Sequence, residues 1–376
     1  MPVPARPLNR LLACRSRPHR AILGLMAPAL GYPVPGTLAQ DLRASSPGEL
    51  VKIATYAYVH TVIASAFENA PELAQAVPRD LCIYFAEMQK ANRRRNDAIR
   101  AQLLQIGEIL AARGIEAVAL KGCAGLLQPV YPAPGMRFLS DIDLLLQDRD
   151  IGAACAALEA AGAAPSTTRG VTGRGHHHLP PLTCTGWAVS VELHHALGGA
   201  KVARLLPAGE VFAASQPGGR PGLRLPGPLH RVMHLAAHAE LSKRPLEAPL
   251  LALRDCLELR QMQAALPAGT VAAARGRFAA AGCGKAFGRL AEAAAAVLEP
   301  AAAPETGAGL RCGNRMLRLF GRPAEQKLRK LAGWTGFYIG QFVSNPQLRS
   351  YYLRMLASPE ALARVSGFHR KWLQRF

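Results

Sequence analysis

The chain has 376 residues, which is enough for two domains or for one domain with a large helical addition. Half of the residues are hydrophobic, which is ample for a core, and no run of 18 uncharged apolar residues occurs, which excludes a transmembrane helix. The eight cysteines form no Cys-x-x-Cys pair, so we expect free thiols and a soluble protein in a reducing cytoplasm.

The net charge of +20 belongs mainly to the two ends of the chain. Residues 1–40 hold five Arg and no acid, and residues 311–376 hold 13 Lys and Arg against Glu325 and Glu360. The last segment also carries aromatic residues among its basic ones, including Trp334, Phe337, Tyr338, Phe342, Tyr351 and Tyr352. A basic, aromatic, helical segment of this kind predicts an acidic partner such as RNA, an acidic peptide or a membrane surface, or else a solvated face with its aromatics in a core.

The first 113 residues divide into two predicted parts. Residues 1–44, rich in Pro and Arg, are expected to be irregular and basic, and the prolines that follow their apolar stretch argue against a signal peptide. Residues 45–113 are expected to be helical, from about Pro47 to Asn69 and from Pro78 to Arg113.

A short buried strand is predicted at Glu116–Leu120, and it ends in the turn Lys121-Gly122. Gly122 allows close backbone approach at this turn. Lys121 is either a solvated strand end or a point charge that neutralises a phosphate.

The most informative stretch is Met136–Leu146, because two of its aspartates alternate along a predicted strand. Asp141 and Asp143 then point to one face, roughly 7 Å apart, while the apolar residues between and after them point to the other. Two adjacent carboxylates repel each other unless a cation neutralises both, and hard oxygen ligands suit Mg²⁺. Ser140 turns the backbone into the strand.

The segment Ala188–His194 alternates apolar and polar residues, which is the pattern of a half-buried strand. Glu192 shares its polar face with His194. If this strand lies beside the Asp141–Asp143 strand, Glu192 supplies a third carboxylate, as in a two-metal phosphoryl-transfer site.

The rest of the chain is divided by composition. We expect an αβ catalytic core at 114–200 with a helix at Asp148–Ala161, a Gly/Pro-rich connector at 201–228 and a helical domain at 229–298. A linker at 299–309 and a basic helical tail at 310–376 would follow.

Two sets of histidines have a zinc interpretation and a structural one. His176, His177 and His178 are adjacent, so at most two share a face, and zinc binding is disfavoured. His230, His234 and His238 recur every four residues on a predicted helix but lack the Glu of the His-Glu-x-x-His motif. We expect that helix to pack against the catalytic sheet with its histidines partly buried, and substrate contact stays open.

These motifs, taken in order, resemble a known family. Lys-Gly after a strand, then Arg-x-x-Ser-Asp-Ile-Asp-Leu-Leu, then Val-Glu-Leu-His is similar to the uncharacterised bacterial nucleotidyltransferase family of the polymerase-β-like superfamily. The resemblance covers roughly residues 50 to 260. It implies an α+β fold, with a small mixed β-sheet core between N-terminal helices and a C-terminal helical region.

The resemblance also implies the chemistry. Mg²⁺ or Mn²⁺ would be bound by Asp141, Asp143 and Glu192, and a nucleoside monophosphate would pass from an NTP to an acceptor hydroxyl. Nucleotide-binding residues would be Lys121, Gly122, Arg137 and Ser140. Arg137 either bridges Asp141 or Asp143, the role we favour in the free protein, or contacts phosphate.

One departure from the family pattern keeps other functions open. The superfamily has Gly-Ser or Gly-Gly at the turn into its helix, whereas residues 121–125 here read Lys-Gly-Cys-Ala-Gly without the serine. The alternatives are a degenerate nucleotide- or peptide-binding module of a biosynthetic complex and a basic protein that binds RNA or a membrane surface. The acceptor is a small molecule, a peptide, a protein or an RNA, with peptide natural-product biosynthesis as a setting suggested by family analogy.

Overall fold

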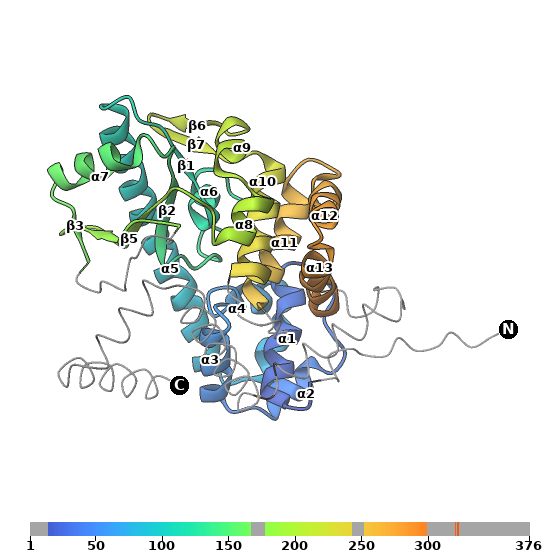
Figure 1. The fold of residues 1–376 in the computed structure, drawn as a ribbon. Helices are drawn as coiled ribbons and strands as arrows, with labels where there is room; N and C mark the ends of the chain where they lie inside the picture. Colours follow the sequence, from blue (N-terminus) through green and yellow to red (C-terminus); the bar gives the residue numbers. More distant parts are fainter. Residues whose placement is uncertain (1–13, 167–176, 243–251, 299–319, 321, 323–376) are drawn as a thin grey trace, which may run out of the picture.

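The computed structural model describes residues 14–166, 177–242, 252–298, 320 and 322. Within them the chain forms one seven-stranded mixed sheet with helices before and after it, as Figure 1 shows. This arrangement confirms the fold class expected from the sequence. The predicted linker at 299–309 and, apart from two residues, the predicted basic tail at 310–376 lie outside the described residues.

The sheet has the strand order β3-β4-β5-β2-β1-β7-β6. β2 runs parallel to β5 and β1 parallel to β7, and the remaining neighbours are antiparallel. The strands are β1 (Ala117–Ala119), β2 (Asp141–Leu145), β3 (Ala164–Pro165), β4 (Leu182–Thr183), β5 (Ser190–His194), β6 (Gln216–Arg220) and β7 (Leu223–Leu225).

Helix α5 (Arg79–Ala111) covers one face of the sheet together with α7 (Ile151–Ala160). Residues spaced three or four apart on α5 are fully buried against alternate strand residues such as Ile142 and Leu144. This spacing puts one stripe of a helix against one face of a strand, which is the pairing that hydrophobic periodicity favours. The stripe on α5 consists of Ile99, Leu103, Ile106 and Leu110.

The N-terminal helices form a second core at the lower end of the molecule in Figure 1, to which later residues such as Phe85, Leu257 and Val297 also contribute. They are α1 (Arg17–Ala29), α2 (Leu38–Arg43), α3 (Pro47–Tyr56), α4 (Ile63–Asn69) and the 3₁₀ helix η2 (Pro71–Ala76). The expectation that residues 1–44 are irregular is therefore wrong for α1 and α2. The apolar run of α1 is buried between α2, α3 and α4, so it is a core helix despite the surrounding prolines.

The expected connector at 201–228 is also wrong, because much of it is regular structure. It contains α8 (Ala200–Leu205), α9 (Ala208–Ala213) and the hairpin of β6 and β7, which adds two strands to the sheet beside β1. Three of its glycines lie in this hairpin, and two of them, Gly219 and Gly222, have a positive φ that glycine adopts readily.

The C-terminal helices pack on the second face of the sheet. Leu145 of β2 and Val118 of β1 point into this core, opposite the face that α5 covers. The helices are α10 (Pro228–Ala237), the π-helix η3 (His238–Ser242), α11 (Leu253–Ala265), α12 (Thr270–Ala280) and α13 (Gly284–Leu298). The face that carries the aspartates therefore looks towards α10. The short helix α6 (Lys121–Leu127) directly follows β1, and its apolar side chains join the core beneath α5.

Candidate metal-binding active site

The parallel pairing of β2 with β5 places the predicted site residues side by side. In the strand register Asp143 lies opposite Glu192, and Leu145 lies opposite His194. Because side chains alternate along a strand, Asp141 and Asp143 share a face with Glu192 and His194. The condition set from the sequence, that these two strands be neighbours, is met.

Asp143 is the most buried carboxylate of this group, with 1% of its surface exposed. Its Oδ1 atom lies 2.7 Å from Nζ of Lys121 and 2.8 Å from Nε2 of His194. Burial opposes ionisation, but Lys121 and His194 outweigh it and hold the pKa of Asp143 well below its ordinary value. Asp143 is therefore an anion in the folded protein, ready to ligate a cation.

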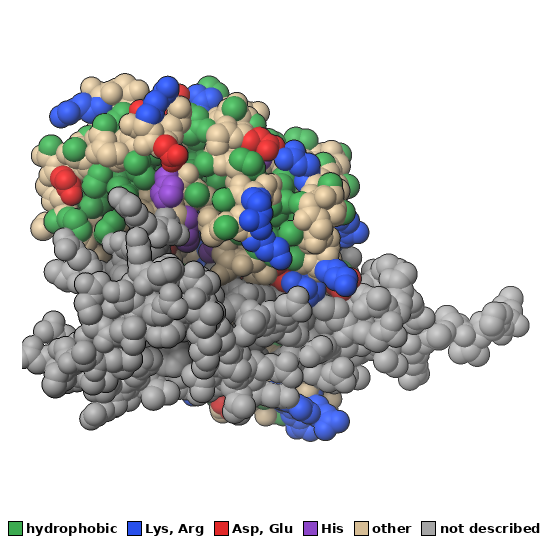
Figure 2. Space-filling view, viewed as in Figure 1, with side chains coloured by type: hydrophobic (Ala, Val, Ile, Leu, Met, Phe, Trp, Pro, Cys, Tyr) green, Lys and Arg blue, Asp and Glu red, His purple; other side chains and the backbone are tan. Residues whose placement is uncertain are grey.

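Glu192 and His194 complete a compact cluster of potential ligands. Nε2 of His194 lies 3.4 Å from Oε2 of Glu192, and Nε2 of His178 lies 3.9 Å from the same oxygen. The hydrogen bond from His194 lowers the pKa of Glu192. Burial alone would lower the pKa of His194, but its hydrogen bonds to Asp143 and Glu192 raise it. Figure 2 shows histidine side chains gathered where Figure 1 draws β5, β2 and α8.

One ligand atom from each of Asp143, Glu192 and His194 lies within 4.8 Å of the others. Two carboxylate oxygens and an imidazole nitrogen fit a divalent metal ion. Carboxylates suit Mg²⁺ and Mn²⁺, whereas imidazole is a common ligand of zinc, iron and nickel. His194 was missed as a ligand in the sequence prediction, although its place on the polar face of β5 was recognised there.

Asp141 lies at the start of β2 and is not a member of this cluster. Its Oδ1 atom accepts a hydrogen bond of 3.1 Å from Ser140 Oγ. Burial and the neighbouring charge of Asp143 raise the pKa of Asp141. A raised pKa means that a nearby cation would stabilise the ionised form, so the position suits a second ligand group beside the cluster.

The turn before α6 brings Lys121 to the cluster in a strained conformation. Lys121 has φ +49°, a left-handed value that is unusual for a residue with a side chain. Gly122 packs so closely that a Cβ there would lie 2.8 Å from Cγ of Leu139. Cys123 is buried, and burial raises the pKa of its thiol, so it is not a nucleophile.

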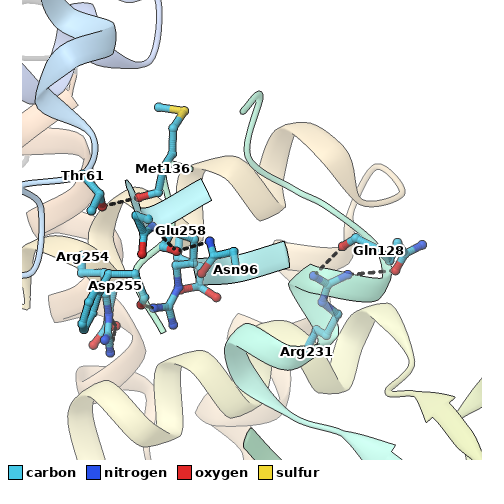
Figure 3. A network of polar contacts seen from close by, with 11 residues as sticks. Thr61, Asn96, Gln128, Met136, Arg231, Arg254, Asp255 and Glu258 are labelled. Carbon is cyan, nitrogen blue, oxygen red and sulfur yellow. Dashed lines mark hydrogen bonds and ion pairs between the residues drawn. The ribbon is translucent and has the colours of Figure 1, made fainter. Parts of the chain in front are cut away.

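Arg137 is turned away from the aspartates. Its Nε atom lies 2.6 Å from Oε2 of Glu258 on α11, so neither Asp141 nor Asp143 is the carboxylate that it bridges. Figure 3 shows Glu258 within a network of polar contacts that also includes Arg254 and Asp255. Arg137 thus ties the loop before β2 to the C-terminal helices.

Side-chain amides of α5 fix the two segments that lead into the site. Asn92 and Asn96 each donate two hydrogen bonds to carbonyl groups of the loop before β2, and both bond the carbonyl of Arg137. Gln102 accepts from the backbone N–H of Ala188 and Val189, just before β5. These amides tie the segments that lead into β2 and β5 to one helix.

The comparison with protein families gives one match. Residues 46–299 match the family described as uncharacterised nucleotidyltransferase. The chain belongs to this family. Neither a curated protein nor a solved structure matches the chain.

Membership of the nucleotidyltransferase family supports nucleotidyl transfer as the general chemistry of the site. The matched residues include all four of the clustered side chains described above, from Lys121 to His194. Among the described residues, no helix is long and apolar enough to cross a membrane.

Proposed function

We propose that the protein is a divalent-metal-dependent nucleotidyltransferase that moves a nucleoside monophosphate from an NTP to an acceptor hydroxyl. The observation that supports this most directly is the pairing of Asp143 with Glu192 across β2 and β5, with His194 and Lys121 against them, in a chain of this family. The acceptor is a small molecule, a peptide, a protein or an RNA, in a cytoplasmic setting.

Asp143, Glu192 and His194 would hold the divalent ion, Mg²⁺ or Mn²⁺, and Asp141 would ligate a second one. When bound, such ions neutralise phosphate charge and lower the pKa of the attacking hydroxyl.

Side chains of the protein bind the phosphate, take up the proton and hold the site in place. Lys121 binds the transferring phosphate through Nζ, and Glu192 accepts the proton of the acceptor hydroxyl at its carboxylate. The acceptor oxygen forms a bond to the α-phosphorus of the NTP as the bond from that phosphorus to the β-phosphate breaks, and pyrophosphate leaves. Ser140 and Gly122 hold Asp141 and the turn in place beside the nucleotide. Catalysis is then mainly positioning and electrostatic stabilisation, as in other phosphoryl transfers.

A binding module without turnover is the second candidate. It is favoured by the turn at residues 121–125, which lacks the serine of the superfamily. Such a module would bind nucleotide or peptide without metal-dependent transfer. The third idea, an acidic partner such as RNA or a membrane surface for the basic tail, concerns residues outside the described part of the chain.

The deciding experiment is transfer of label from α-³²P NTPs, each with Mg²⁺ or Mn²⁺, to the purified protein and to cell extract. The test variant is Asp141→Asn/Asp143→Asn, and the matched control is Asp148→Asn, an exposed carboxylate outside the cluster. Metal-dependent labelling that is lost in the double variant and kept in the control supports nucleotidyl transfer. Equal labelling by the double variant would sink it, and NTP binding without labelling would favour the binding module.

A further inference from the structure

A polar pocket lies beside the metal-binding cluster, between α6, α10 and α11. Lys121 lines it and also contacts Asp143, so the pocket adjoins the cluster directly. The other basic residues of its lining are Arg137, Arg231, Arg254, His234 and His238, and its acids are Asp255 and Glu258.

The acids of the pocket are matched to two of its arginines. Arg137 Nε lies 2.6 Å from Glu258 Oε2, and Arg254 Nη2 lies 3.2 Å from Asp255 Oδ1. These pairs leave the cation of Arg231 without a carboxylate of its own in the pocket lining.

Arg231 is a buried guanidinium, with 4% of its surface exposed, whose hydrogen bonds go to uncharged groups. Nη1 donates to Oε1 of Gln128 at 2.8 Å and Nη2 donates to the carbonyl of Gln128 at 3.2 Å, as Figure 3 shows. Its Nε atom is buried without a hydrogen-bond partner in the described part of the chain. Burial lowers the pKa of Arg231 although Glu258 attracts its charge from beyond ion-pair distance. A buried charge without a direct ion pair is costly, and an anion in the pocket would reduce that cost.

His234 lies one helical turn after Arg231 on α10 and lines the same pocket. It is 4% exposed, and its Nε2 atom also has no partner among the described residues. Residues three apart on a helix share a face, so both groups are directed to one place. Two unsatisfied nitrogen atoms on one face of a pocket point to a ligand that carries acceptor oxygens.

We propose that this pocket binds the phosphate tail of the nucleotide, with Arg231 as its charged contact and His234 as a second hydrogen-bonding contact. The inference rests on the proposed function. It assigns the cation that balances the charge of the phosphate tail to Arg231 on α10. Arg137, for which phosphate contact was the alternative to a structural bridge, is already paired with Glu258. Lys121 then links the pocket to Asp143, so the tail lies next to the site of transfer.

The test is calorimetric binding of inorganic triphosphate, which needs no knowledge of the base, in the presence of Mn²⁺. Arg231→Gln should weaken binding by about tenfold or more, because hydrogen bonds to charged groups carry that much. The exposed Arg113→Gln serves as a charge-matched control and should bind like the wild type. His234→Phe, which replaces a buried polar ring by an apolar one, should fold and bind more weakly, and it serves if Arg231→Gln does not fold.

Each outcome separates this inference from the proposed function. Triphosphate binding that is equal in wild type, Arg231→Gln and His234→Phe overturns the inference, even where labelled NTP assays still show transfer. The inference is also overturned if both variants bind triphosphate like the wild type but label the extract more weakly. That result would assign the pocket to an anionic group of the acceptor. Loss of triphosphate binding in both variants, with Arg113→Gln unaffected, supports it.

Discussion

Lys121 Nζ and His194 Nε2 converge on one oxygen of Asp143, at 2.7 and 2.8 Å. In this arrangement the ammonium group lies where a metal ion bound to Asp143 would compete with it. Lys121 therefore has two roles in the proposed enzyme, as the counter-charge of Asp143 before metal binds and as a phosphate contact afterwards.

Lys121→Met separates these roles. Without the ammonium, Mn²⁺ meets no competing cation at Asp143, so its affinity should stay equal or rise. Transfer should still fall by about 100-fold or more, because a charge that stabilises the transition state is gone. Mn²⁺ titration and labelled-NTP assays measure the two effects, with Lys201→Met, an exposed lysine of α8, as control. Loss of metal binding in Lys121→Met would contradict the competition described here.

The positive φ of Lys121 predicts an unusual order of stability. At φ +49° glycine is less strained than alanine, so Lys121→Gly should be more stable than Lys121→Ala by about 1 kcal/mol. Lys201 lies inside α8 with ordinary helical geometry, so there the alanine variant should be the more stable one. Denaturant unfolding of the four variants tests both orders. If Lys121→Ala were as stable as Lys121→Gly or more stable, the backbone at Lys121 would carry no strain.

Alternation along Asp141–Leu145 and Ser190–His194 was enough to predict both strands that carry the candidate ligands and the face that their acids share. The fact that Glu192 lies beside Asp143 could be stated only as a condition, because strand pairing depends on contacts remote in sequence. His194 shows the same limit, since a histidine on that face becomes a ligand only when Asp143 lies opposite its neighbour.

The wrong predictions concern segments 1–44 and 201–228, which were expected to be irregular from their composition but contain helices and strands. β6 (Gln216–Arg220) contains one proline and two glycines, which weaken a strand, and it survives as an edge strand because β7 pairs with it. Arg231 illustrates a different limit. Its sequence neighbours indicate an ordinary helix. Among the described residues it has no direct ion pair, because Glu258 pairs with Arg137 instead, and neither fact can be predicted from the sequence of the helix.

We predict that α5 positions the site through the side chain of Asn96. Its side chain is 2% exposed and donates to the carbonyls of Pro134 and Arg137, at 2.7 and 2.8 Å. Asn96→Ala should lower the free energy of unfolding by about 1–3 kcal/mol, because buried carbonyls lose a donor. It should also reduce transfer per folded molecule, since the loop before Asp141 loosens.

The control for this prediction is Asn69→Ala, which removes a single hydrogen bond to Pro28 in the N-terminal helices. It should destabilise the protein without changing transfer per folded molecule at a temperature well below unfolding. If Asn96→Ala behaves in the same way, its role is stability alone and the positioning role fails.

His234 makes stability depend on pH. Burial lowers the pKa of His234 from 6.5 to about 3, so the imidazole is neutral in the folded protein. The unfolded chain binds a proton near pH 6.5 that the folded chain does not bind, so the stability fully present above pH 6.5 is lost as the pH falls towards 3. Between pH 7 and 5 this linkage costs about 2 kcal/mol. Over the same interval the free energy of unfolding of His234→Phe should fall by about 2 kcal/mol less than that of the wild type. Urea unfolding in metal-free buffer at each pH measures the difference. Parallel losses in the variant and the wild type would mean that this imidazole is accessible to protons in the folded state.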